Sequence, residues 1–162
     1  MRRSVRLVLV ALLLAGALGT PSHAAAAGRI RLLVPEIGID ASLRTLACGV
    51  PRLPDGRVYI WGCIAAPNRY LLSHAWGTFR PLRFAAERGQ LRRGMRLTLI
   101  YPSGTRERYR IAGWAIFRNA NPWPTRVGHW MADPARAVSL QTCLYRNSSG
   151  RVVAHFLPIR GG

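Results

Sequence analysis

The chain contains no lysine and few acidic residues. All 24 of its basic residues are arginine, against 6 aspartates and glutamates, so the 162 residues carry a formal net charge of +18. So small an acidic set, spread along the chain, argues against a carboxylate cage for calcium. The arginines are scattered rather than gathered in one patch, so we do not expect binding to nucleic acid. The charge favours a basic exterior that faces an anionic membrane or an anionic envelope polymer.

Motifs for metals and nucleotides are also missing. The sequence has no His-Glu-x-x-His or Cys-x-x-Cys spacing for zinc. Gly49 and Gly56 do not follow the strand–helix pattern that cradles a phosphate. Glu36 and Asp40, four residues apart, could in principle act as an acid–base pair, although a polar turn face is the commoner explanation. We therefore predict no cofactor.

The N-terminus has the composition of an export signal. Three arginines among the first six residues precede an apolar run over 7–18, then Gly and Pro, then small residues. The run is shorter than the roughly 20 residues that a membrane-spanning helix needs. We predict a signal peptide or N-terminal membrane anchor over residues 1–27 and one extracytoplasmic domain over 28–162. His23 belongs to the leader and takes no part in the catalytic argument.

Beyond the leader, short apolar runs alternate with turn residues, which is typical of strands. The helix candidate is 79–87, where four apolar side chains share one face, and we expect long loops over 48–56 and 119–133. Strands are predicted over 29–34, 36–46, 58–61, 70–72, 95–101, 106–117, 137–143 and 151–159. So many short strands in a single core favour an all-β fold, a closed eight-stranded barrel with one or two short helices, since closure removes exposed edges.

The residues that carry chemistry are a thiol, an imidazole and a guanidinium. Cys143 ends an alternating run just before a loop, and His74 likewise follows a short strand. An imidazole can take the proton of a thiol, and a nearby cation favours a thiolate. Arg151, eight residues after the cysteine, offers several donors to an oxyanion. Taken singly, a buried cysteine and a structural histidine are the commoner roles for such residues.

The surroundings of these residues resemble the two signature blocks of the sortase family. The blocks are 71–77, Leu-Leu-Ser-His-Ala-Trp-Gly, and 139–143, Ser-Leu-Gln-Thr-Cys, followed by Arg151. The resemblance implies an eight-stranded β-barrel with Cys143 as nucleophile, His74 as acid–base and Arg151 as the carbonyl-stabilising cation. The segments 58–63 and 68–70 look most like class E and class F sortases of high-GC bacteria. Ser73 departs from the family's usual glycine, and Arg146 is a rival to Arg151.

The same resemblance implies a function and its partners. Sortases cut a sorting motif near the C-terminus of an exported protein through a thioester, then transfer the protein to an amine. The amine belongs to a peptidoglycan precursor or a pilin lysine, and an uncleaved N-terminal segment would add a membrane contact. Two alternatives stay open: a thiol peptide hydrolase on the same barrel, and a catalytically inactive sortase-like binding module of the envelope.

If Cys143 is the nucleophile, the other two cysteines are natural partners outside the cytoplasm. A Cys48–Cys63 disulfide is therefore expected, and two free thiols are the alternative. His155 alternates with apolar residues, which indicates a structural role, and for His129 surface packing is the commoner explanation. Three tryptophans, Trp76, Trp123 and Trp130, could line a substrate cleft or pack in the core or loops.

Overall fold

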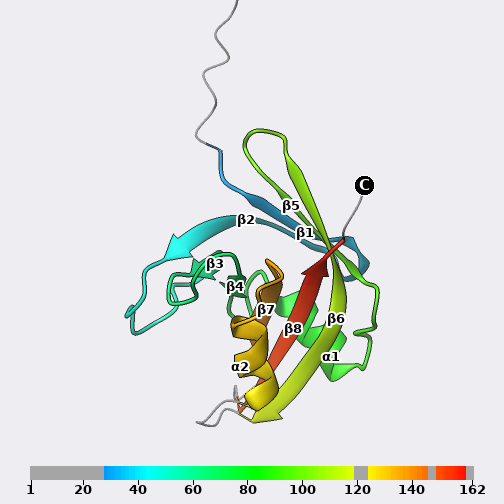
Figure 1. Ribbon diagram of the computed structural model, residues 1–162. Helices are drawn as coiled ribbons and strands as arrows, with labels where there is room; N and C mark the ends of the chain where they lie inside the picture. Colours follow the sequence, from blue (N-terminus) through cyan, green and yellow to red (C-terminus); the bar gives the residue numbers. More distant parts are fainter. Residues whose placement is uncertain (1–27, 119–123, 146–148, 160–162) are drawn as a thin grey trace, which may run out of the picture.

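The computed structural model describes residues 28–118, 124–145 and 149–159. They form a closed eight-stranded barrel with two short α-helices and one 3-10 turn (Figure 1). The elements are β1 (Arg31–Val34), η1 (Pro35–Ile37), β2 (Ile39–Leu46), β3 (Val58–Trp61), β4 (Arg69–Leu72), α1 (Arg80–Glu87), β5 (Arg96–Ile100), β6 (Arg106–Arg118), α2 (Thr125–Met131), β7 (Val138–Leu144) and β8 (Gly150–Pro158). Around the barrel the strand order is β1-β2-β3-β4-β7-β8-β6-β5. The predicted all-β barrel is confirmed.

The interior of the barrel is filled by alternate residues of the strands. Leu140 and Leu144 of β7 and Val152 and Phe156 of β8 lie in one large apolar core, each at most 1% exposed. Helix α1 joins this core through Leu82 and two alanines of its predicted apolar face. Phe84, predicted on the same face, is instead half-buried outside the core, beneath the guanidinium groups of three arginines. Because side chains alternate between the two faces of a strand, the odd-numbered residues of β7 and β8 point to the outer face.

A second, smaller apolar cluster lies on that outer face, and α2 covers it. Val127 of α2 packs there with Tyr70 of β4 and Val153 of β8, and Trp130 and Met131 join at its margin. The prediction of a loop over 119–133 is therefore wrong for 125–131, and residues 119–123 lie outside the described part. Val127, Trp130 and Met131 have the i, i+3, i+4 spacing of a helix, which nearby prolines and Gly128 concealed.

The other predicted elements differ from the structure mainly at their ends. The expected strand over 36–46 begins only at Ile39, because Pro35–Ile37 form the 3-10 turn η1. The loop over 48–56 is free of strand and helix, as predicted. In the described residues no helix is long and apolar enough to span a membrane. The predicted leader, 1–27, lies outside the described residues.

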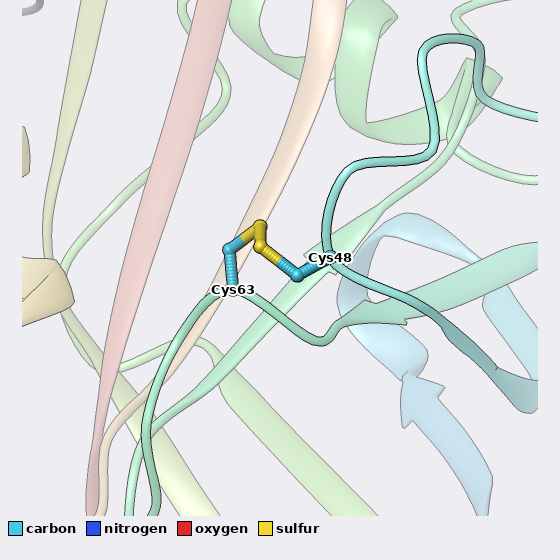
Figure 2. Close-up of a disulfide and its surroundings, with 2 residues drawn as sticks. All are labelled: Cys48 and Cys63. Atoms are coloured by element: carbon cyan, nitrogen blue, oxygen red, sulfur yellow. A yellow bond between two sulfur atoms is a disulfide. The ribbon is translucent and has the colours of Figure 1, made fainter.

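The expected disulfide is present. Cys48 and Cys63 are bonded, with their Cα atoms 4.6 Å apart (Figure 2). The bond joins the start of the β2–β3 loop to the residue two positions after β3, where the Gly62 N–H also donates to the Leu46 carbonyl at 2.8 Å. The start of the loop is thus fixed covalently to the end of the next strand.

Candidate active site

Three neighbouring strands bring the predicted catalytic residues together. β4 pairs parallel with β7, with Leu72 opposite Gln141. The Thr142 hydroxyl contacts the Ser73 carbonyl one residue past the end of β4, and the same register continued by one more residue brings His74 level with Cys143. On its other side, Cys143 is the direct antiparallel partner of Arg151 in β8. Residues distant in the sequence thus meet at the ends of adjacent strands.

These side chains share the outer face of the sheet. Paired residues of neighbouring strands point the same way, and the strands lie about 4.8 Å apart. Leu144, next to Cys143, is in the barrel core, so the thiol points outward, where it is half-buried. Phe117 of β6 pairs with Arg151 and extends the arrangement to a fourth strand. We call His74, Cys143, Arg151 and Phe117 the outer row.

Two buried hydroxyls fix the strand ends behind this row. The Thr142 hydroxyl donates to the Ser73 carbonyl at 2.8 Å, and the Ser73 N–H donates to the Gln141 carbonyl at 3.4 Å. The Ser73 hydroxyl donates in turn to the Arg57 carbonyl at 2.8 Å, at the end of the β2–β3 loop. Ser73, the departure from the family pattern, therefore ties the strand that carries His74 to a neighbouring loop.

The imidazole of His74 is held on both sides. Its Nε2 atom lies 2.8 Å from the Leu53 carbonyl oxygen and 3.2 Å from Asp55 Oδ1. The Trp76 ring stacks on the imidazole at 4.5 Å between centroids and 15° between planes. His74 is 19% exposed and Asp55 82% exposed in their side chains, so the ring sits at the surface but is not free to turn.

Cys143 and Arg151 complete the chemical groups of the row. Cys143 is outside any disulfide and half-buried. The Arg151 guanidinium is also half-buried, and its Nη1 donates to the Gly150 carbonyl at 3.1 Å. Arginine carries five N–H donors in a rigid fork, so a guanidinium next to a thiol has the donors that a developing oxyanion needs. The row thus contains a free thiol between an imidazole and a guanidinium.

The outer face is covered unevenly behind the row. Two residues further along each strand, away from the outer row, the outer face carries Leu72, Gln141, Val153 and Ala115. Two residues further again, it carries Tyr70, Ser139, His155 and Gly113. Trp130 of α2 lies over this last set: it stacks on His155 at 5.0 Å and comes close to Gly113. Trp130 of α2 thus lies over the residues furthest from the outer row, and the four side chains of the row are themselves only half-buried.

A hollow opens at the Phe117 end of the outer row. It measures about 630 Å³ and is lined by Ile116, Phe117, Arg118, Tyr145 and Ser149. Ile116 and Tyr145 are exposed apolar side chains in it. Because Phe117 is paired with Arg151, this hollow adjoins the cationic end of the row.

A second histidine forms a separate buried chain. His155 Nδ1 lies 3.0 Å from the Ser139 hydroxyl, and His155 Nε2 lies 3.2 Å from Asp133 Oδ2. Ser139 is 3% and His155 2% exposed, so no substrate reaches them. Burial lowers the pKa of His155, and the neighbouring Asp133 opposes that change less strongly. The chain ties the residues after α2 to the barrel, in accord with a structural His155.

The remaining sequence candidates separate clearly. Asp40 pairs with Arg31, and Glu36 pairs with Arg96. Glu36 and Asp40 therefore form two separate surface ion pairs rather than an acid–base pair. His129 is an exposed residue of α2. Arg146 and Trp123 lie outside the described residues. Within the described residues, no group of three or more His, Cys, Asp or Glu side chains could hold a metal ion.

Sequence reasoning missed the contacts around His74. Nothing in the loop 47–57, which is rich in Gly and Pro, marks Asp55 or the Leu53 carbonyl as partners of a histidine 19 or more residues away. Phe117 was also missed, because its place beside Arg151 depends on the β6–β8 pairing. The disulfide was the one signal that the loop is held to the barrel.

The barrel is similar in fold to those of solved sortase structures. Sortase A from Corynebacterium diphtheriae matches with a TM-score of 0.63 at 14% identity, over 83% of this chain and 62% of that one. A sortase D5 transpeptidase from Clostridium perfringens matches at 0.60 and 12% identity, over 82% and 79%. Sortase E1 from Streptomyces coelicolor, solved with a tripeptide in its active site, matches at 0.58 and 18% identity, over 82% and 88%.

No family model matches the sequence, and no curated protein matches it. The chain spans just under two thirds of the sortase A structure with which it was compared. At these identities the likeness establishes the fold: this is a sortase-type barrel. The chemistry of the outer row has to be inferred from the positions of its own side chains.

Proposed function

We propose that the protein is an extracytoplasmic cysteine transpeptidase of the sortase type. The observation that carries the proposal is the outer row: the β7–β8 pairing sets Arg151 beside Cys143, and the β4–β7 register, continued past the end of β4, brings His74 level with it on the other side. The sortase-type fold, the resemblance of segments 71–77 and 139–143 to the sortase signature blocks, and the partial exposure of the free Cys143 thiol support it. The disulfide supports export, because such bonds persist outside the reducing cytoplasm.

The proposed reaction has two stages. In the first, the Cys143 thiolate attacks a substrate carbonyl carbon, a C–S bond forms, and the scissile C–N bond breaks. The leaving amine takes its proton from the His74 imidazolium, while Arg151 donates to the carbonyl oxygen as negative charge develops on it. The product of this stage is a thioester on Cys143 and a free C-terminal fragment.

In the second stage an amine replaces the fragment. The incoming amine attacks the thioester carbon, His74 accepts its proton, the new C–N bond forms, and the C–S bond breaks to restore the thiolate. We propose an exported protein with a C-terminal sorting motif as substrate, and a peptidoglycan precursor or pilin lysine as acceptor. The hollow beside Phe117 and Arg151 is where we place the approach of this amine.

We place the protein nearest to class E or class F sortases. The segments 58–63 and 68–70 carry this assignment, and the barrel covers 88% of the sortase E1 structure. We also propose that residues 1–27 export the domain or anchor it to the membrane.

The proposal is tested by incubating the purified chain with a library of peptides, with and without an added primary amine such as triglycine. A transpeptidase releases C-terminal fragments and joins the remaining acyl group to the amine, and Cys143→Ala does neither. Cleavage that ends only in a free carboxylate would identify the thiol hydrolase instead. Cleavage that persists in Cys143→Ala would overturn both assignments.

A further inference from the structure

The loop that touches His74 is exposed and is tied to the rest of the chain near its two ends. We call residues 47–57 the clamp loop. Apart from Leu53, its residues from Cys48 onward are exposed. It is fixed at its start by the Cys48–Cys63 disulfide and at its end by the Ser73 hydroxyl on the Arg57 carbonyl. Between these ties, the Leu53 carbonyl and the Asp55 carboxylate both contact His74 Nε2.

Asp55 differs from most of the chain's acidic residues because it pairs with a histidine rather than with an arginine. Four of the six acidic side chains, Glu36, Asp40, Glu87 and Glu107, pair with arginines. The other two face histidines: Asp133 faces the buried His155, and Asp55 faces His74. The protein has 24 arginines that could pair with an exposed carboxylate, yet Asp55 lies against the imidazole of His74.

The Leu53 contact fixes the position of a proton. A backbone carbonyl only accepts hydrogen bonds, so His74 Nε2, 2.8 Å away, must donate and must carry the hydrogen. In the neutral ring Nδ1 is then the unprotonated nitrogen, and it alone can accept a proton from the thiol or the incoming amine. Trp76, stacked on the ring, keeps the imidazole plane from turning.

We propose that the clamp loop is the positioning device of this active site. The Leu53 carbonyl and the Asp55 carboxylate hold His74 as the Nε2–H tautomer, and the Cys48–Cys63 disulfide keeps both of them in place. Asp55 is a positioning residue that acts through His74, and Nδ1 is the nitrogen that exchanges protons. This inference rests on the proposed function, in which His74 moves a proton.

Two variants separate the parts of the device. Cys48→Ser with Cys63→Ser releases the start of the loop, and Asp55→Asn removes a charge from an exposed side chain without disturbing packing. Because misplacement of a catalytic group by about 1 Å costs up to about 100-fold in rate, the double variant should lose the larger factor. An exposed ion pair is worth little, so Asp55→Asn should lose about fivefold, and Asp55→Glu should recover most of it. Asp40→Asn, a surface carboxylate paired with Arg31, is the matched control.

The experiment measures two quantities on the full chain at pH 8. Long-range ¹H–¹⁵N spectra of the histidine rings report the tautomer of His74, and iodoacetamide labelling reports the rate of Cys143 alkylation. We expect the Nε2–H tautomer in the wild type and a mixture of tautomers in the double serine variant. We expect slower labelling in both loop variants and no change in Asp40→Asn.

The outcomes distinguish this inference from the proposed function. If His74→Ala labels as fast as the wild type, the imidazole does not serve the thiol, and the proposed function fails. If His74→Ala slows labelling but the loop variants change neither rate nor tautomer, only the clamp loop inference is overturned. An Nδ1–H tautomer in the wild type would also overturn it. Because Asp55 is exposed, its variants still test the idea should the double serine variant fold poorly.

Discussion

Removing the disulfide is expected to lower stability by an amount that the chain length sets. In Cys48→Ser/Cys63→Ser, the unfolded chain regains the freedom of a loop closed across 15 positions. The chain-entropy relation gives about 10 cal/mol/K for such a loop, or about 3 kcal/mol at 25 °C. For a domain of this size, that loss lowers Tm by roughly 10 °C. Circular dichroism during heating measures it.

Two controls isolate the covalent bond as the cause. Cys143→Ser changes a thiol that is outside the disulfide, so its Tm should stay close to that of the wild type. A reducing agent should bring the wild type down to the Tm of the double variant and leave that variant unchanged. If the double variant melts within about 2 °C of the wild type, well short of the entropy estimate, the bond does not stabilise the barrel by closing this loop.

Three further predictions follow from the site and the packing. Arg151→Ala should reduce kcat/KM for transpeptidation by about 10²–10³, the loss typical of one oxyanion donor, whereas Arg108→Ala, at an exposed position of β6 outside the hollow, should cost far less. The free energy of unfolding should fall as the pH drops below 6.5, because burial lowers the pKa of His155 and the unfolded chain then binds more protons than the folded one. Urea titrations at several pH values should show a weaker dependence of that free energy on pH in His155→Gln. Gly62→Ala should destabilise by about 1–3 kcal/mol, because its Cβ would lie 2.8 Å from the Leu46 carbonyl oxygen, while Gly128→Ala, in open space on α2, should stabilise by up to about 1 kcal/mol in the same titrations.

Each of these has an outcome that contradicts it. A loss in Arg151→Ala no larger than in Arg108→Ala would contradict the assignment of Arg151 to the oxyanion. An undiminished slope in His155→Gln would assign the pH dependence to other groups. Equal effects of the two glycine variants would mean that the tight contact at Gly62 relaxes without cost.

The sequence was sufficient for the barrel because its strands are short, apolar and separated by strong turn residues. The strand over 58–61 was predicted at its observed bounds, and the hairpin of β5 and β6 within one residue at each end. Helix α2 was missed because its apolar residues are few and its neighbours are prolines. Its stability comes from packing on Tyr70 and Val153, which lie on distant strands.

The site divides in the same way. His74, Cys143 and Arg151 were nominated because the segments around them resemble the sortase signature blocks; taken singly, the three residues would not have stood out. Their common face requires the parallel pairing of β4 with β7, which no local pattern specifies. Asp55 contacts His74 from an exposed loop with no periodicity, so only the fold reveals it.

The most direct test of the account is to trap the acyl-enzyme intermediate. After incubation with the peptide library, mass spectrometry of the intact protein and of its proteolytic peptides should find an acyl adduct on Cys143. Hydroxylamine should release that adduct, and Cys143→Ala should not form it. An adduct on another residue, or one that forms equally in Cys143→Ala, would contradict the assignment of this barrel as a cysteine transpeptidase.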